Sequence, residues 1–169
     1  MKAIVNIDKN WGIGREGDQP FYIPEDLKFF QRKTSGKIIV MGRATLMALP
    51  NGAPLKNRVN VVLTRQQDFA AGDAIICHSF EDLHKELAAW PPDDIFVIGG
   101  AEIYAALLDF CTKVYVTKIH AKAACDRHFP NLDKMENWQL HNSSEIKAHE
   151  GLEFQFCEYI NTNPKSPVH

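Results

Sequence analysis

One acidic residue stands where a predicted helix should face the protein interior. The helix is expected to run from Pro24, which suits a first helical position because its missing N–H has no partner there, to about Thr34. On this helix Asp26, Leu27 and Phe30 share one face. A carboxylate between Leu and Phe on an inward face needs a donor or a cation, because an unpaired buried carboxylate is costly. Asp26 is therefore a candidate ligand-binding group.

A simpler interpretation of Asp26 stays open at this point. An Asp in the first turn of a helix often serves only the positive end of the helix dipole, while its side chain is half exposed. The helix alone does not distinguish a dipole partner from a ligand-binding carboxylate. The residues that follow the predicted strands favour a ligand.

Four predicted strands are followed by glycine or arginine residues that suit a nucleotide. These are Gly42-Arg43, Thr64-Arg65, Gly99-Gly100 and the glycine-bearing loop after Ile7. Free backbone N–H groups, hydroxyls and guanidinium groups all bind phosphate oxygens. Taken alone, Arg43 would be interpreted as a surface charge. Because the carboxyl ends of parallel strands meet at one edge of a sheet, their convergence predicts a nucleotide with several phosphates.

Strand-like and helix-like segments alternate through most of the chain, which is typical of an α/β protein. The expected helices are 24–34, a helix beginning at 43, 79–90 and 101–108. The expected strands are 3–7, 37–42, 58–65, 74–78, 94–98, 113–120 and, joined by a turn at 149–151, 138–146 and 153–160. These segments predict a three-layer α-β-α sandwich with a central, mostly parallel eight-stranded sheet, an antiparallel C-terminal strand and about four flanking helices.

Composition favours one globular domain over residues 1–169, with 161–169 as a flexible tail. The net charge of −2 is not typical of a nucleic-acid-binding or membrane-surface protein. The 4 cysteines are far apart, which favours neither a metal site nor a disulfide framework and fits a reducing cytoplasm. No stretch approaches the ~20 apolar residues of a membrane span. A cytoplasmic monomer is the expectation.

Several motifs, in their order and spacing, resemble those of the dihydrofolate reductase family over nearly the whole chain. They are Trp11-Gly12-Ile13-Gly14, the segment from Ile23 to Phe30, Val40-Met41-Gly42-Arg43 with Thr45, Arg58, Ile98-Gly99-Gly100 with Ile103-Tyr104, Val116-Thr117-Lys118-Ile119, and Asp126 with Phe129-Pro130. The resemblance implies NADPH-dependent reduction of 7,8-dihydrofolate to 5,6,7,8-tetrahydrofolate, by hydride transfer to C6 and protonation at N5. It also implies a role in one-carbon metabolism and a place among antifolate targets.

For the substrate, the resemblance implies that Asp26 accepts two hydrogen bonds from the pterin, with Thr117 supporting the carboxylate. The carboxylate would hold C6 against the nicotinamide and raise the proton affinity of N5, while water delivers the proton. Arg58 would bind the α-carboxylate of the glutamate tail. The implied catalytic positions are Asp26, Thr117 and Phe21. The implied substrate-binding positions are Ile4, Val5, Asp26, Leu27, Phe30, Leu49, Arg58, Ile98 and Thr117.

For the cofactor, the resemblance implies NADPH, because Arg43, Thr64 and Arg65 would supply a hydroxyl and cations for a 2′-phosphate. It also implies a cis peptide between Gly99 and Gly100. No metal is implied. The implied cofactor-binding positions are Asn6, Ile13, Gly14, Gln19, Gly42, Arg43, Ala44, Thr45, Leu63, Thr64, Arg65, His78, Ile98, Gly99, Gly100, Ala101, Glu102, Ile103 and Tyr104.

The loop Asp8–Tyr22 is expected to close over the nicotinamide, with Asp126 accepting hydrogen bonds from backbone N–H groups near Gly14. The chain departs from the family pattern at several positions. Phe21 replaces a Trp whose indole N–H would hold a water near the substrate, and the other departures are Gln19, Arg127 and Asn6. These departures affect the water route and loop closure rather than the reaction.

Two alternatives remain. A reductase of the same fold could act on a pyrimidine of the riboflavin pathway, but a carboxylate in an apolar, pterin-sized pocket and Arg58 argue against it. A catalytically silent nucleotide-binding module would keep Arg43, Arg65 and the glycine pair, but it would have no need of Asp26. Adding dihydrofolate and following the absorbance of NADPH distinguishes these alternatives from a dihydrofolate reductase.

Overall fold

The computed structural model of the protein describes residues 1–15 and 19–166. Its helices are α1 (Pro24–Thr34), α2 (Arg43–Ala48), α3 (Phe80–Leu87), α4 (Ala101–Leu107) and the 3-10 turns η1 (Pro50–Gly52), η2 (Pro92–Asp94), η3 (Leu108–Phe110) and η4 (Leu132–Lys134). Its strands are β1 (Lys2–Ile7), β2 (Gly12–Gly14), β3 (Ile38–Gly42), β4 (Val59–Leu63), β5 (Ile75–Cys77), β6 (Ile95–Gly99), β7 (Lys113–Ile119), β8 (Arg127–His128), β9 (Trp138–Ser143), β10 (Lys147–His149) and β11 (Leu152–Asn161).

The predicted eight-stranded, mostly parallel sheet is confirmed. Within the described residues, eight strands follow the continuous order β10-β11-β7-β1-β6-β3-β4-β5, and β9 pairs with β11 as a ninth strand. From β7 through β5 neighbouring strands run parallel, whereas β11 runs antiparallel to β7. The edge strand expected over 138–146 is interrupted: β9 and β10 pair with successive halves of β11 and together fill one edge position.

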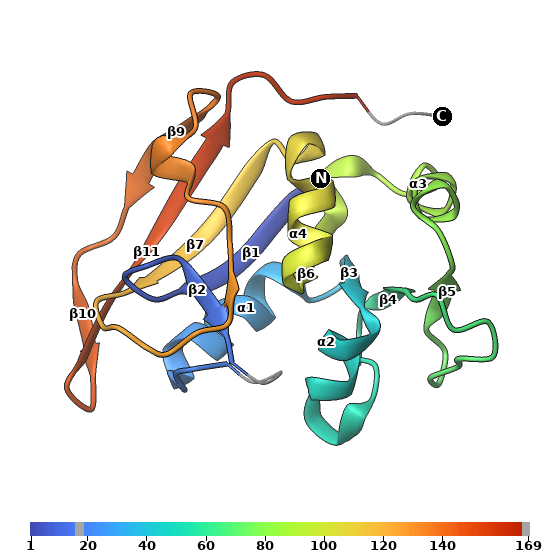
Figure 1. Cartoon of the computed structure of the whole chain (residues 1–169), viewed down its shortest axis with the longest axis horizontal. Coiled ribbons are helices and arrows are strands. Elements are labelled where there is room, and N and C mark those ends of the chain that lie inside the picture. The colour runs from blue at the N-terminus through green and yellow to red at the C-terminus, as the bar shows by residue number, and fades with distance from the viewer. Residues whose placement is uncertain (16–18, 167–169) are drawn as a thin grey trace.

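Helices cover both faces of the sheet, as predicted for a three-layer sandwich (Figure 1). Alternation along β3 shows the two cores. Ile39 and Met41 belong to the core that includes α1 and α2, while Ile38 and Val40 belong to the core that includes α3 and α4. Since β3 is buried on both faces, it reads as a continuous apolar run in the sequence rather than as an alternating one.

Helix α1 has the predicted bounds. It begins at Pro24 and ends at Thr34, with acidic residues in its first turn and basic residues in its last. Helix α3 is shorter than predicted, because it ends at Leu87 rather than near Trp90. Its start is as predicted: the Ser79 hydroxyl accepts a hydrogen bond from the backbone N–H of Asp82 at 3.0 Å.

A short ribbon of β2 and β8, which the sequence does not reveal, lies beside the main sheet. The buried carboxylate of Asp8 anchors it by accepting hydrogen bonds from the backbone N–H groups of Asn10, Gly12 and Ala123 at 2.8, 2.7 and 3.0 Å. Burial acts to raise the pKa of Asp8, but these donors outweigh it and the pKa lies below its usual value. A Cβ on Gly12 would approach Cys125 Sγ to 2.6 Å, so the ribbon requires glycine there.

The predicted flexible tail begins too early. Asn161 is buried and ends β11, and its side-chain amide donates to the carbonyl of Cys111 at 3.0 Å. The chain beyond it is also attached, since the backbone N–H of Lys165 donates to the carbonyl of Asp109 at 2.8 Å. Two parts of the sequence predictions, residues 16–18 of the loop and residues 167–169 of the tail, lie outside the described residues.

Candidate active site

A cavity of about 950 Å³ opens at the carboxyl ends of the parallel strands. It brings together most of the residues singled out in the sequence. Those that line it are Ile4, Val5, Asn6, Ile13, Gly14, Gln19, Asp26, Leu27, Phe30, Gly42, Arg43, Ala44, Thr45, Leu63, Thr64, Arg65, His78, Ile98, Gly99, Gly100, Ala101, Glu102, Ile103 and Tyr104.

At one end of the cavity, the side chains of Asp26, Asn6 and Thr117 form a hydrogen-bonded group that we call the carboxylate end. The Thr117 hydroxyl donates to Asp26 Oδ1 at 2.6 Å, and Asn6 Nδ2 donates to Asp26 Oδ2 at 3.0 Å. Burial raises the pKa of the Asp26 carboxyl above its usual value, and the two hydrogen bonds offset part of that increase. Asp26 is thus a desolvated carboxylate that faces a cavity.

Apolar side chains from three elements surround this carboxylate. Ile4 comes from β1, Leu27 and Phe30 from α1, and Ile98 from β6. Leu27 is 41% exposed, and it lines the cavity. An apolar wall around the carboxylate of Asp26 suits a flat ring that carries adjacent N–H donors.

The opposite end of the cavity is cationic, and we call Arg43, Thr45, Thr64 and Arg65 the arginine end. Arg43 and Thr45 lie in the first turn of α2, and Thr64 and Arg65 follow β4. Both guanidinium groups are exposed, and neither has a hydrogen bond or ion pair with the residues that the structure describes. The carbonyl of Thr64 lies 3.0 Å from Nδ1 of His78, which lines the same cavity.

The glycine pair lies between the two ends. The peptide bond between Gly99 and Gly100 is cis, as the resemblance implies. A Cβ on either glycine would lie 3.4 Å from the Thr45 hydroxyl, so side chains here would fill the space beside α2. The buried Tyr104 hydroxyl donates to the carbonyl of Ile4 at 2.7 Å and ties α4 to β1.

Several residues named from the sequence do not line the cavity. Phe21 packs with Ile23, Ile119 and Phe154, and Leu49 packs on the core beneath α1 and α2. Thr117 contacts the cavity only through Asp26.

Arg58 and Asp126 also lie outside the cavity lining. Arg58 Nε donates to the Thr34 hydroxyl at 3.0 Å, and its guanidinium lies 6.0 Å from the ring of Phe30, which does line the cavity. Asp126 lies beside the start of β8, and its backbone N–H donates to the carbonyl of Gly14 at 2.9 Å.

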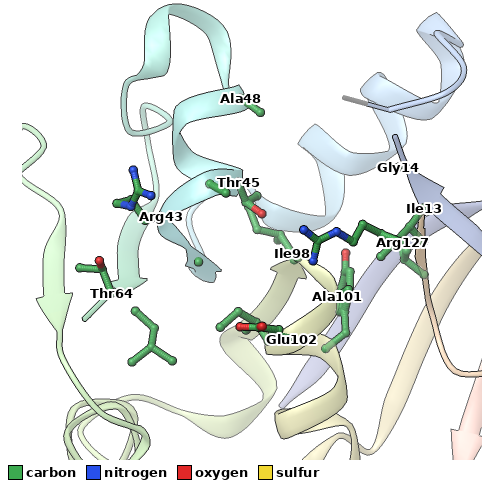
Figure 2. Close-up of a pocket in the computed structure, with 18 of the residues that line it drawn as sticks. Ile13, Gly14, Arg43, Thr45, Ala48, Thr64, Ile98, Ala101, Glu102 and Arg127 are labelled. Carbon is green, nitrogen blue, oxygen red and sulfur yellow. The ribbon is translucent and has the colours of Figure 1, made fainter. Parts of the chain in front are cut away.

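The sequence did not reveal five lining residues, namely Ala48, Gln66, Ser79, Phe80 and Arg127. Arg127 matters most, because it adds a third guanidinium. Figure 2 shows it reaching into the pocket beside Ile13, from the side opposite Arg43. Its signal in the sequence was a large cation where the resemblance expects a small residue. Its position in the cavity wall depends on the pairing of β8 with β2, which the sequence does not reveal.

No group of three or more His, Cys, Asp or Glu side chains in residues 1–15 and 19–166 is placed to hold a metal ion. The longest helices described are also too short or too polar to cross a membrane. The polar groups that face the cavity are a half-buried, desolvated carboxylate at one end and exposed cations at the other.

Comparison with known proteins agrees with this arrangement. The family model described as dihydrofolate reductase matches residues 1–161. A dihydrofolate reductase of Bacillus subtilis is 36% identical over 165 residues, covering 96% of this chain and 95% of the relative, and one of Staphylococcus haemolyticus is 33% identical over 152 residues, covering 90% and 86%. A solved structure of an Enterococcus faecalis dihydrofolate reductase complexed with NADP(H) and RAB-propyl superposes with a TM-score of 0.81 at 32% identity, covering 95% of each chain.

Proposed function

The chain belongs to the dihydrofolate reductase family, and we propose that it catalyses the NADPH-dependent reduction of 7,8-dihydrofolate to 5,6,7,8-tetrahydrofolate. The observation that carries this proposal is the desolvated carboxylate of Asp26, held by two donors in an apolar cavity. A module that only bound nucleotides would gain nothing from that desolvated charge, which costs free energy in the absence of a ligand.

The substrate is held at the carboxylate end. An ionised carboxylate has about four acceptor positions, and the hydrogen bonds from Asn6 and Thr117 leave roughly one free on each oxygen of Asp26. Two adjacent donors, the pterin 2-amino group and the neighbouring ring nitrogen, suit these positions. The resulting charge-assisted contact fixes the ring and favours a proton on N5, which water supplies.

The cofactor is held at the arginine end. The residues present fit a dinucleotide with an extra phosphate. Exposed guanidinium groups, the Thr45 and Thr64 hydroxyls and a glycine pair without side chains line one region. Arg43 and Arg65 select NADPH over NADH by binding its 2′-phosphate, and Arg127 adds positive charge from the other side. When bound, NADPH supplies the hydride.

The remaining roles follow from where the residues stand. Arg58 binds the carboxylate of the substrate tail, since its guanidinium lies beside the ring of Phe30 at the cavity wall. The loop Asp8–Tyr22 closes over the cofactor with support from Asp126, whose backbone already pairs with Gly14. The activity resides in one domain, and the protein works as a cytoplasmic monomer.

The experiment that tests this function follows NADPH absorbance after dihydrofolate is added to the purified protein. We expect substrate-dependent oxidation that is much faster with NADPH than with NADH. Parallel assays with a ribityl-aminopyrimidine substrate test the alternative that the protein is a reductase of the riboflavin pathway. NADPH binding without any dihydrofolate-dependent oxidation would overturn the proposal and leave a nucleotide-binding module.

A further inference from the structure

We propose that Asn6 is a positioning residue of the reaction: with Thr117 it holds the Asp26 carboxylate ionised and oriented for a ligand with two adjacent donors. The sequence placed Asn6 among the cofactor contacts, but its amide donates to Asp26 Oδ2 at 3.0 Å. This inference rests on the proposed function, since it assigns a role in the binding of dihydrofolate. The resemblance marks Asn6 as a cofactor contact and as a departure from the family pattern, and it implies no contact between Asn6 and Asp26.

The sheet register explains why two donors meet one carboxylate. Asn6 on β1 and Thr117 on β7 are direct partners on neighbouring parallel strands, so their side chains leave the sheet on the same face. Helix α1 crosses that face and brings Asp26 onto the pair. Each carboxylate oxygen then receives one donor, Oδ1 from Thr117 and Oδ2 from Asn6. Two side chains on paired strands therefore fix the plane of the carboxylate, and neither donor comes from a loop.

The charged side chains near Asp26 do not hold its carboxylate. On β7, Lys118 faces the other side of the sheet and lies 3.5 Å from Asp133. On α1, Glu25 is paired with Lys147 at 3.2 Å.

From α4, the buried Tyr104 hydroxyl donates to the Ile4 carbonyl. Glu102 and Arg127 line the cavity from α4 and β8, and no described hydrogen bond or ion pair joins either to Asp26. Among the residues that the structure describes, the two neutral donors Asn6 and Thr117 therefore stabilise the carboxylate charge directly.

The amide of Asn6 stabilises the charge of Asp26 rather than the strand that carries it. Val5 and Ile7, the neighbours of Asn6 on β1, are apolar and buried, so the strand gains its stability without a polar side chain at position 6. The hydrogen bond from Asn6 goes to the charged form of Asp26, so it favours ionisation and acts to lower the pKa of this carboxyl. Loss of the Asn6 donor should accordingly raise that pKa.

The test measures the Asp26 titration directly by carbon-13 NMR of aspartate-labelled protein, with the signal assigned by its absence in Asp26→Asn. Asn6→Leu removes the amide at similar volume and should move the midpoint up by about one to two pH units. Asn6→Asp places a second carboxylate beside the first and should give a larger, two-step titration. The matched control is Asn142→Leu, the same exchange at an exposed position on β9, which should leave the midpoint unchanged.

The kinetic arm uses the same variants with dihydrofolate. The acid limb of the kcat/KM profile reports groups of the free enzyme, so in Asn6→Leu it should move to higher pH with the NMR midpoint. A merely structural role would lower kcat/KM at all pH values without moving the limb. If Asn6→Leu does not fold, Asn6→Ala removes the same amide without a branched side chain and should give the same shift.

An Asp26 midpoint in folded Asn6→Leu or Asn6→Ala equal to that of the wild type would overturn the proposal. The NMR arm needs no turnover, so its result stands even when the proposed activity fails. If the wild type does not reduce dihydrofolate but Asn6→Leu shows the predicted NMR shift, the proposed function is refuted and the role of Asn6 is supported. If the wild type reduces dihydrofolate but Asn6→Leu shows no shift, the function is supported and the role of Asn6 is refuted.

Discussion

The two ends of the cavity hold their charges in opposite ways. At the carboxylate end, Asp26 is desolvated and bound by two donors from adjacent strands before any ligand arrives. At the arginine end, Arg43 and Arg65 are exposed and make no hydrogen bond or ion pair with the described residues. One end is preassembled, and the other keeps its cations in water.

The difference follows from the cost of burial. A desolvated carboxylate loses its hydrogen bonds to water, and hydrogen bonds from fixed donors must replace them. Those donors also set the orientation of the carboxylate. An exposed guanidinium keeps its hydration and can turn toward a phosphate when one binds. Changes at the carboxylate end should therefore affect the chemistry and its pH dependence. Changes at the arginine end should affect cofactor affinity and its salt dependence.

Asp26→Asn should give the largest effect, because it removes the charge that the carboxylate end is built around. We expect a loss of about 2–4 kcal/mol in transition-state stabilisation, by analogy with the loss of one member of a buried pair. Activity should recover in part at low pH, where the substrate is already protonated. Steady-state kcat/KM across pH measures this, and near-wild-type activity at neutral pH would contradict the role assigned to Asp26.

Arg43→Met and Arg65→Met should each weaken NADPH binding about tenfold, the expected loss for one charge-assisted phosphate contact. NADH binding should change less, because it lacks the 2′-phosphate. Fluorescence titration of both cofactors at two salt concentrations measures the effect. Equal losses for NADPH and NADH would place these arginines on the shared phosphates instead.

Arg127→Thr should weaken NADPH binding only several-fold, since an exposed charge contributes about 0.2–1 kcal/mol. With NADPH saturating, kcat should stay near the wild-type value. The matched control is Lys122→Thr, which removes an exposed cation from the same segment outside the cavity. The same loss of affinity in both variants would indicate a general effect of net charge.

The smallest effect concerns stability. Because burial raises the pKa of Asp26 in the folded state, the folded protein binds this proton more tightly than the unfolded chain does. The carboxyl therefore lowers the stability of the ligand-free protein as the pH rises through the folded-state pKa. Asp26→Asn should unfold at a higher temperature than the wild type at neutral pH, and the difference should disappear in acid.

Thermal unfolding followed by circular dichroism across pH measures that difference. Asp68→Asn, at an exposed carboxyl, serves as the control and should show no such pH-dependent gain. A wild type that is more stable than Asp26→Asn at neutral pH would mean that the donors outweigh burial. The two ends of the cavity would then differ less in the free-energy cost of their charges.

Local signals predicted the helices and strands well, and contacts across the sheet escaped prediction. Pro24 and Thr34 mark the ends of α1 as expected, because a helix start and stop depend on neighbouring residues. The partner of Asn6 could not be read in the same way, since the hydrogen bond to Asp26 depends on strand order and register. Asn161 was mistaken for part of a tail because its partner is the carbonyl of Cys111 on a distant segment.

The ribbon of β2 and β8 joins two segments that both face the cavity. Arg127 on β8 pairs with Gly14 on β2, next to Ile13. An anion drawn to the Arg127 guanidinium thus acts on the same small body that carries the start of the Asp8–Tyr22 loop. Binding free energies linked through one body are reciprocal. If anion binding favours one position of that loop, a change that favours the same position will raise the affinity for the anion by the same factor. The affinity for the cofactor would then report the position of the loop.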